Sequence, residues 1–258
     1  MLNERVDTID SYFAEVSSIN KVSNWLFRLS IVFSFAVFFS SDISWLYSIL
    51  NIIFIVVTVL YVVISNWVSL FLLRNAQNKR RVHLLSNSFG IKLDDEETYR
   101  YYNNPQSPSI VRLGVNVFEN TLFTLRVTEE MVKRERIKGI LYFLVLLVII
   151  LIRETDLNLI AIVAQTIFTT SLLINWLRLE LLRTSCDRLL TEFRQIFLTA
   201  ESNISEKVKT LILSLVFRYE TTVASMGVHL SSKTFHKLNS KVTAEWETIK
   251  RNVFSSVE

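Results

Sequence analysis

Glycine and proline are nearly missing from this chain. Its 258 residues include only 4 Gly and 2 Pro, whereas an average protein of this length carries about 30 of the two together. Turns, hairpins and phosphate-binding loops draw on these two residues. The glycines also stand singly, so no glycine-rich nucleotide motif can be written. We therefore expect an all-α protein with long helices and few turns.

Four runs without any charged residue divide the sequence: residues 29–41, 43–73, 139–152 and 157–177. A helix needs about 20 apolar residues to span a membrane. The second and fourth runs meet this length alone. The first and third meet it if they begin near residues 25 and 137, with the flanking Arg28 and Lys138 reaching back to the interface. The pattern predicts an all-α membrane protein with four transmembrane helices in two hairpins, which turn at residues 40–44 and 153–156.

The distribution of basic residues predicts the orientation of these hairpins. The two turns hold one basic residue, Arg153, whereas Lys and Arg cluster beside the other ends of the runs. By the positive-inside rule, both termini and the segment between the hairpins lie in the cytoplasm. The expected segments are an amphipathic cytoplasmic helix (1–24), a transmembrane hairpin (25–73), a cytoplasmic stalk, loop and helix (74–138), a second hairpin (139–177) and a cytoplasmic helical tail (178–258).

The cytoplasmic helices are expected to pack through single apolar faces. In the N-terminal helix this face includes Ile9, Phe13 and Val16. In the tail, the helix of the fourth span continues beyond the membrane with an apolar face of its own, and two further amphipathic segments follow it. The tail positions are Leu179, Leu182, Cys186, Leu189, Phe193 and Ile196, then Val208, Leu211, Leu215, Tyr219 and Met226, and finally Phe235, Leu238, Val242, Trp246, Ile249 and Val253. Gly90 is a plausible end for the stalk helix.

No constellation of catalytic or metal-binding residues is recognisable. His83, His229 and His236 lie far apart, and Cys186 is the sole cysteine. The acidic run 94–97 is typical of a solvated surface. We therefore expect no enzyme activity, no metal and no cofactor.

Polar residues follow one stripe along each of two spans. The stripe positions are Asn51, Thr58 and Ser65 in the second span, and Asn158, Gln165 and Thr169 in the fourth. One interpretation is hydrogen bonding between helices, which small polar residues commonly supply. The other is that a stripe lines a water-filled pore in an oligomer. No charged residue lies in the middle of a span, which argues against a proton pump or voltage sensor.

Basic and aromatic residues gather around the only strong loop signal, at Pro105 and Pro108. Arginine and tyrosine together can neutralise phosphates and stack on bases. The alternative is that basic residues near a membrane only set the topology, which explains Arg100 and Arg112 less well because they lie far from a membrane end. The candidate ligand-binding residues are Lys79, Arg80, Arg81, Arg100, Tyr101, Tyr102, Asn103, Asn104 and Arg112.

The stretches 101–104 (YYNN) and 116–120 (NVFEN), set between two apolar hairpins and followed by a helical tail, resemble a known family. The layout over roughly residues 20–200 is similar to the four-transmembrane effectors of bacterial antiviral operons. These are the SMODS-associated class found beside nucleotidyltransferases in CBASS-like and Hailong-type systems. The resemblance implies a multi-pass protein of the bacterial inner membrane that disrupts the membrane or forms a channel. It also implies control by a cyclic oligonucleotide or a short DNA oligomer from the partner enzyme.

Together these observations favour an oligomeric channel effector in antiphage defence, gated by a nucleotide or oligonucleotide bound on its cytoplasmic helices. A homotetramer is expected, because a few small polar side chains per subunit need several copies to enclose water. Two alternatives stay open. The chain could be a non-conducting membrane scaffold or sensor that recruits a soluble partner, or a small transporter that works as a dimer.

Overall fold

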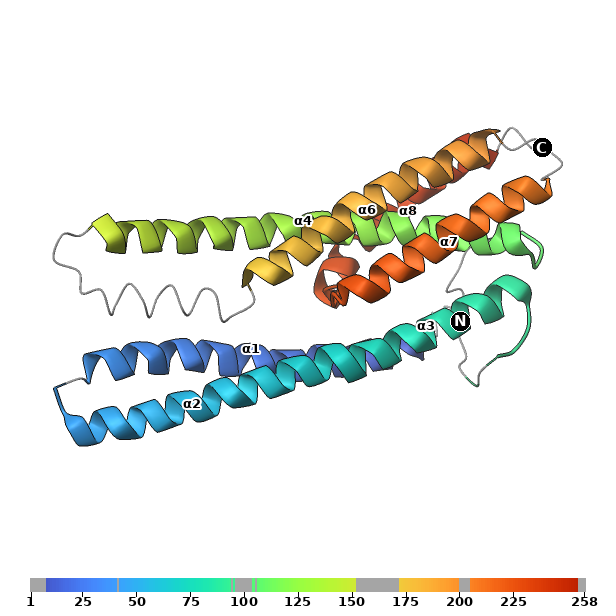
Figure 1. Ribbon diagram of the computed structural model, residues 1–258. Helices are drawn as coiled ribbons and strands as arrows, with labels where there is room; N and C mark the ends of the chain where they lie inside the picture. The colour runs from blue at the N-terminus through green and yellow to red at the C-terminus, as the bar shows by residue number, and fades with distance from the viewer. Residues whose placement is uncertain are drawn as a thin grey trace.

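The computed structural model describes residues 8–40, 42–93, 95, 104, 106–151, 172–199 and 205–254. Every regular element within these ranges is a helix, and none is a strand (Figure 1). The all-α prediction is therefore confirmed for the described part of the chain. The helices are α1 (Ile9–Phe39), α2 (Ser44–Trp67), η1 (Val68–Leu72), α3 (Leu73–Phe89), α4 (Ile110–Leu151), α6 (Leu172–Thr199), α7 (Glu206–Met226) and α8 (Ser232–Phe254).

The first half of the chain is one long hairpin. α1 and α2 are antiparallel and meet at the predicted turn, and α2 continues through η1 into α3 without a break (Figure 1). η1 is a single π-helical turn, which holds one residue more than an α-helical turn does. The helix ends as predicted at Gly90, whose φ of 65° places it in the left-handed region that favours glycine.

One stripe of α1 packs this hairpin together. Its buried residues are Ile9, Val16, Ser23, Ser30 and Ser34. Near the N-terminus the stripe is aliphatic, and Val16 forms a small core with residues of η1 and α3. Where α1 enters its uncharged run, serine takes over at the same face. Small side chains there allow two helices to approach closely in a membrane.

Two helices, Ile9–Phe39 and the continuous Ser44–Phe89, are long and apolar enough to cross a membrane. No residue of α2 is buried by the rest of the chain. Trp45 and Trp67 stand 66% and 54% exposed near its two ends, about 33 Å apart along the helix. This separation matches a hydrocarbon core of about 30 Å, and tryptophan prefers the two membrane interfaces. The hairpin therefore carries the features of a membrane-spanning unit.

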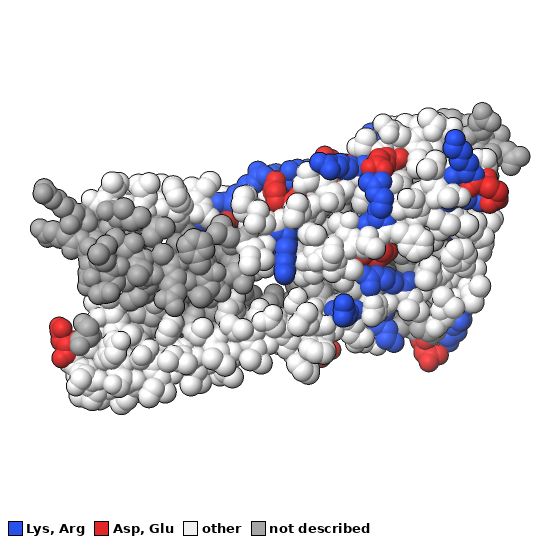
Figure 2. All heavy atoms as spheres, in the orientation of Figure 1, with Lys and Arg blue, Asp and Glu red and all other residues white. Residues whose placement is uncertain are grey.

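Charged side chains are unevenly distributed over the surface. On the face shown in Figure 2, basic and acidic side chains are spread over the bundle and α3, whereas the far part of the α1–α2 hairpin is uncharged except for Asp42 in the turn between the two helices. In the second predicted hairpin, residues 139–151 form the end of α4 and expose side chains such as Phe143 and Leu151. Residues 152–171, which hold the second turn and most of the fourth predicted span, lie outside the described residues.

The second half of the described chain is a helical bundle of α4, α6, α7 and α8 (Figure 1). Its centre is aromatic: the ring of Phe118 in α4 lies 5.6 Å from that of Phe193 in α6 and 5.2 Å from that of Trp246 in α8. The apolar faces predicted for the tail are buried here at Leu182, Cys186, Leu189, Phe193, Leu215, Tyr219, Val242 and Trp246. In the 106–110 region, Ser109 accepts the backbone N–H of Arg112 and caps α4.

Gly114 of α4 allows a close approach to α7 and α6. A Cβ atom at this position would lie 2.5 Å from Cγ2 of Ile212 and 3.2 Å from Cζ of Phe197. We expect Gly114→Ala to reduce the free energy of unfolding by about 1–3 kcal/mol through overpacking. Thermal unfolding of the purified chain in nanodiscs measures this.

Gly139→Ala is the matched control, because a Cβ there meets nothing within 4 Å. It should leave stability unchanged or raise it by up to about 1 kcal/mol through helix propensity. Equal effects of the two substitutions would contradict the close-packing argument.

Candidate functional site

The α2 members of the polar stripe lie on the side of the helix that is turned towards α1. Asn51, Thr58 and Ser65 are half-buried, as are Val57 and Ile64 beside them, whereas the other intervening aliphatic residues are exposed. The ring of Tyr61, on the same side, lies 5.7 Å from that of Phe27 in α1, and its side chain is hydrogen-bonded to Ser65. Within one chain the stripe therefore has the position expected for packing between helices. A role in lining a pore stays a prediction that requires several copies.

Arg80 and Arg81 of α3 converge on one carboxylate of the bundle. The guanidinium of Arg80 donates to both oxygens of Glu220 in α7, at 2.8 and 2.6 Å, and Nε of Arg81 donates to the same carboxylate at 2.9 Å. Arg80 and Glu220 are only 12% and 14% exposed. The guanidinium of Arg80 also lies 5.8 Å above the ring of Tyr219. This cluster joins the hairpin to the bundle. Two of the predicted phosphate-binding residues, Arg80 and Arg81, are therefore already engaged in an ion pair within the chain.

Asn104 and Arg112 belong to a polar network where α3 meets the start of α4. The side-chain amide of Asn104 donates to Oδ1 of Asn116 at 3.0 Å and to the backbone carbonyl of Arg112 at 3.3 Å. Asn116 donates in turn to Ser88 and Asn87 of α3. Arg112 donates to Asn87, while its Nε is buried without a partner in the described residues. The network fixes the end of α3 against α4.

The other predicted site residues divide into two groups. Lys79 lies with its Nζ 5.6 Å from the ring centroid of Tyr12, on α1. Arg100, Tyr101, Tyr102 and Asn103 lie outside the described residues, as do Asn158, Gln165 and Thr169 of the fourth span. The structure thus brings together Arg80 with Arg81, and Asn104 with Arg112. Among the described residues no group of three or more His, Cys, Asp or Glu side chains could hold a metal ion.

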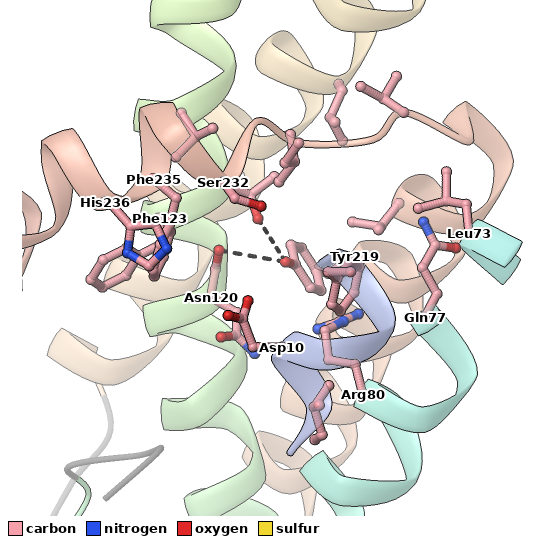
Figure 3. A pocket seen from close by; sticks show the side chains of 18 residues that line it. Asp10, Leu73, Gln77, Arg80, Asn120, Phe123, Tyr219, Ser232, Phe235 and His236 are labelled. Carbon is pink, nitrogen blue, oxygen red and sulfur yellow. Dashed lines mark hydrogen bonds between the residues drawn. The ribbon is translucent and has the colours of Figure 1, made fainter. Parts of the chain in front are cut away.

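A cavity of about 190 Å³ opens beside the Arg80–Glu220 cluster. Figure 3 shows Arg80 and Gln77 of α3, Asp10 of α1 and Tyr219 of α7 around it. The Tyr219 hydroxyl pairs with Thr124 at 2.8 Å and lies 3.4 Å from the backbone carbonyl of Asn120. Burial raises the pKa of this phenol, so it stays neutral. The cavity therefore lies between the hairpin and the bundle, next to their strongest polar contact.

The turn between α7 and α8 supplies a second contact to the hairpin. The imidazole of His229 is hydrogen-bonded to the backbone of Phe13 in α1, and burial lowers its pKa. The positive φ of Gly227 ends α7 just before this residue. α1 is therefore held to the bundle by a neutral histidine.

A comparison of the chain with models of protein families, with curated proteins and with solved structures finds no match. The assignment of function accordingly depends on the geometry described above.

Sequence reasoning missed Glu220, Gln77 and Asn87. Glu220 had a signal that could have been used, because it is the only acid in residues 207–244 and falls in an apolar stretch of helix. An isolated acid opposite surplus arginines predicts an ion pair. Gln77 and Asn87 had none, since amides on a polar helix are common and their neighbours are distant in sequence.

Removing the charge of Glu220 should destabilise the chain strongly. Glu220→Gln removes the carboxylate that Arg80 and Arg81 share in a largely buried cluster, and we expect a loss of about 3 kcal/mol in unfolding free energy. Chemical or thermal unfolding in nanodiscs measures it. The control is Glu192→Gln, which breaks a pair with Arg218 whose partners are 50% and 38% exposed; there the expected loss is below about 1 kcal/mol. A smaller loss for Glu220→Gln than for the control would be inconsistent with a buried cluster.

Acidification should weaken the contact of His229. Its pKa in the folded chain is lower than the unfolded value of 6.5, so its contribution is complete above about pH 6.5 and is lost as the pH falls towards the folded pKa. We expect His229→Gln to flatten the fall in melting temperature below pH 6.5. His236→Gln, at an exposed position of α8, should keep the wild-type profile. Identical profiles for all three proteins would refute this role.

Proposed function

We propose that the chain is a subunit of an oligomeric membrane channel that is controlled from its cytoplasmic helices. One observation carries the proposal. The uncharged helix α2, none of whose residues is fully buried, runs without a break into α3, and α3 is fixed to the bundle through Arg80, Arg81 and Glu220. A change in the bundle therefore acts on the membrane segment through a rigid helix.

The exposed apolar surface supports assembly of several copies in a bilayer. α2 exposes isoleucine, valine and leucine along most of its length, and lipid or further copies must cover these side chains. We propose a homotetramer in a bacterial inner membrane, with four spans per subunit and both termini in the cytoplasm. The stripes of Asn51, Thr58 and Ser65, and of Asn158, Gln165 and Thr169, are the proposed pore lining.

The proposed ligand is a nucleotide or short oligonucleotide from a partner nucleotidyltransferase, and the proposed setting is antiphage defence. Both rest on the resemblance described above and on the basic residues around α3 and the 91–109 segment. Since Arg80 and Arg81 already donate to the carboxylate of Glu220, we assign phosphate contact to Lys79, Arg100 and Arg112. Arg80 and Arg81 then transmit the signal to the hairpin.

Cysteine accessibility tests the pore assignment. The natural Cys186 is buried, and burial raises the pKa of its thiol to about 12, so it does not react. In a conducting oligomer, a charged and membrane-impermeant methanethiosulfonate should block current through Asn51→Cys, Thr58→Cys and Ser65→Cys. The measurement is the current across planar bilayers before and after the reagent.

Ile55→Cys, at an exposed aliphatic position of α2, is the control and should not react. If the stripe variants conduct but resist the reagent as Ile55→Cys does, the stripe serves helix packing and the pore lies elsewhere. If the purified wild-type chain carries no current with or without added oligonucleotide, the channel proposal is wrong.

A membrane scaffold is the second candidate, and one surface favours it. Leu211 and Phe217 of α7 are 45% and 66% exposed, although they lie in the cytoplasmic bundle. A soluble partner that covers them would be recruited to the membrane without any conductance. Bilayer recordings of the purified chain separate the two candidates.

A further inference from the structure

The cavity beside the Arg80–Glu220 cluster has the construction of a small-molecule site. It is lined by residues from α1, α3, α4, α6, α7, the α7–α8 turn and α8, so it lies at the junction of the hairpin and the bundle (Figure 3). Its volume of about 190 Å³ exceeds that of a cavity of about 150 Å³ that binds benzene. The space therefore admits one aromatic ring with a small substituent.

The walls of this cavity are mostly apolar and partly aromatic. Phe13, Phe123 and Phe235 line it, and the rings of the last two lie 5.6 Å apart. Val127, Leu182 and Val223 complete much of the remaining wall. Such walls favour a planar apolar body, because aromatic rings pack well edge to face or offset.

One polar group on the wall is open to the cavity. Gln77 lines the cavity and is 6% exposed as a residue, and neither its amide oxygen nor its amide nitrogen is among the fully buried side-chain atoms that lack a hydrogen-bond partner. A ligand that offers both a donor and an acceptor can pair with this amide.

The charges around the cavity disfavour an anionic ligand. Its charged lining residues are Arg80 and Asp10, and the guanidinium of Arg80 is held on both oxygens of Glu220. Two carboxylates thus lie near one inward-facing cation. An anion that entered would have to displace Glu220 or give up its own hydration without compensation.

We propose that this cavity binds a compact uncharged molecule, consisting of one aromatic ring and a neutral carboxamide-like group that pairs with Gln77. This site goes beyond the proposed channel, whose ligand is anionic and contacts other residues. Its occupant bridges α1 and α3 to the bundle, so it favours the arrangement in which these helices are joined.

The test uses two probes of nearly the same shape: a neutral carboxamide, which donates and accepts hydrogen bonds, and an anionic carboxylate, which only accepts them. 4-Fluorobenzamide and 4-fluorobenzoate are added to the full chain in nanodiscs, and ¹⁹F line broadening is measured against empty nanodiscs. We expect the amide to bind at least about tenfold more tightly than the carboxylate. Gln77→Leu should weaken amide binding about fivefold, the equivalent of one lost neutral hydrogen bond. Val228→Phe, which fills the cavity from the turn, should abolish it.

Gln195→Leu is the matched control, because Gln195 is exposed on α6 away from the cavity lining; it should bind the amide as the wild type does. Equal affinity for the two probes, or undiminished binding in Val228→Phe, overturns the proposal. These outcomes are independent of the channel proposal, because the ¹⁹F signal reports binding of the probe and does not require the chain to conduct. If Gln77→Leu does not fold, the wild-type probe pair and Val228→Phe still decide.

Discussion

The carboxylate of Glu220 joins the apolar hairpin of α1, α2 and α3 to the helical bundle. Ion pairs on a protein surface contribute little, but this one is largely withdrawn from water and shared by two arginines of the same helical turn. The geometry fixes both the height and the rotation of α3 against α7. The cavity, the cation over the Tyr219 ring and the contact of the α7–α8 turn with α1 all lie around this pair. The asparagine network at the end of α3 and the contact of His229 with α1 are the other polar links between the two halves.

The fold could be predicted from the sequence to the extent that periodicity and charge determine it. Long uncharged runs and a near absence of glycine and proline indicated helices, and Gly90 and the turn near residue 40 followed from local rules. The packing face of α6 was predictable because Leu182, Cys186, Leu189 and Phe193 recur at helical spacing and point into a single aromatic core. On α7 the same reasoning was less accurate: Leu211 shares the predicted face but is exposed, and its neighbour Ile212 is buried against Gly114 instead.

The candidate sites were less predictable, for a physical reason. A basic residue has the same appearance in a sequence whether it binds a phosphate, sets a topology or pairs with an acid. Arg80 and Arg81 were identified from their charge, but the decisive partner lies about 140 positions away. The asparagine network was predicted in part, since Asn104 and Arg112 were identified as candidate site residues near the prolines. Asn87 and Asn116 belong to it only because α3 and α4 cross there.

The π-helical turn η1 has a consequence for the long helix that contains it. Each residue in an α-helix advances the side chains by about 100° around the axis, so one extra residue within a turn changes the angular phase of everything that follows. Val68 begins this turn and Leu73 follows it, yet both pack with Ala76 into the same small core as Val16 of α1. The extra residue therefore keeps the contact face of α2 and that of α3 on one side of the rod. The helix stays packed on α1 from its apolar part into the part that reaches the bundle.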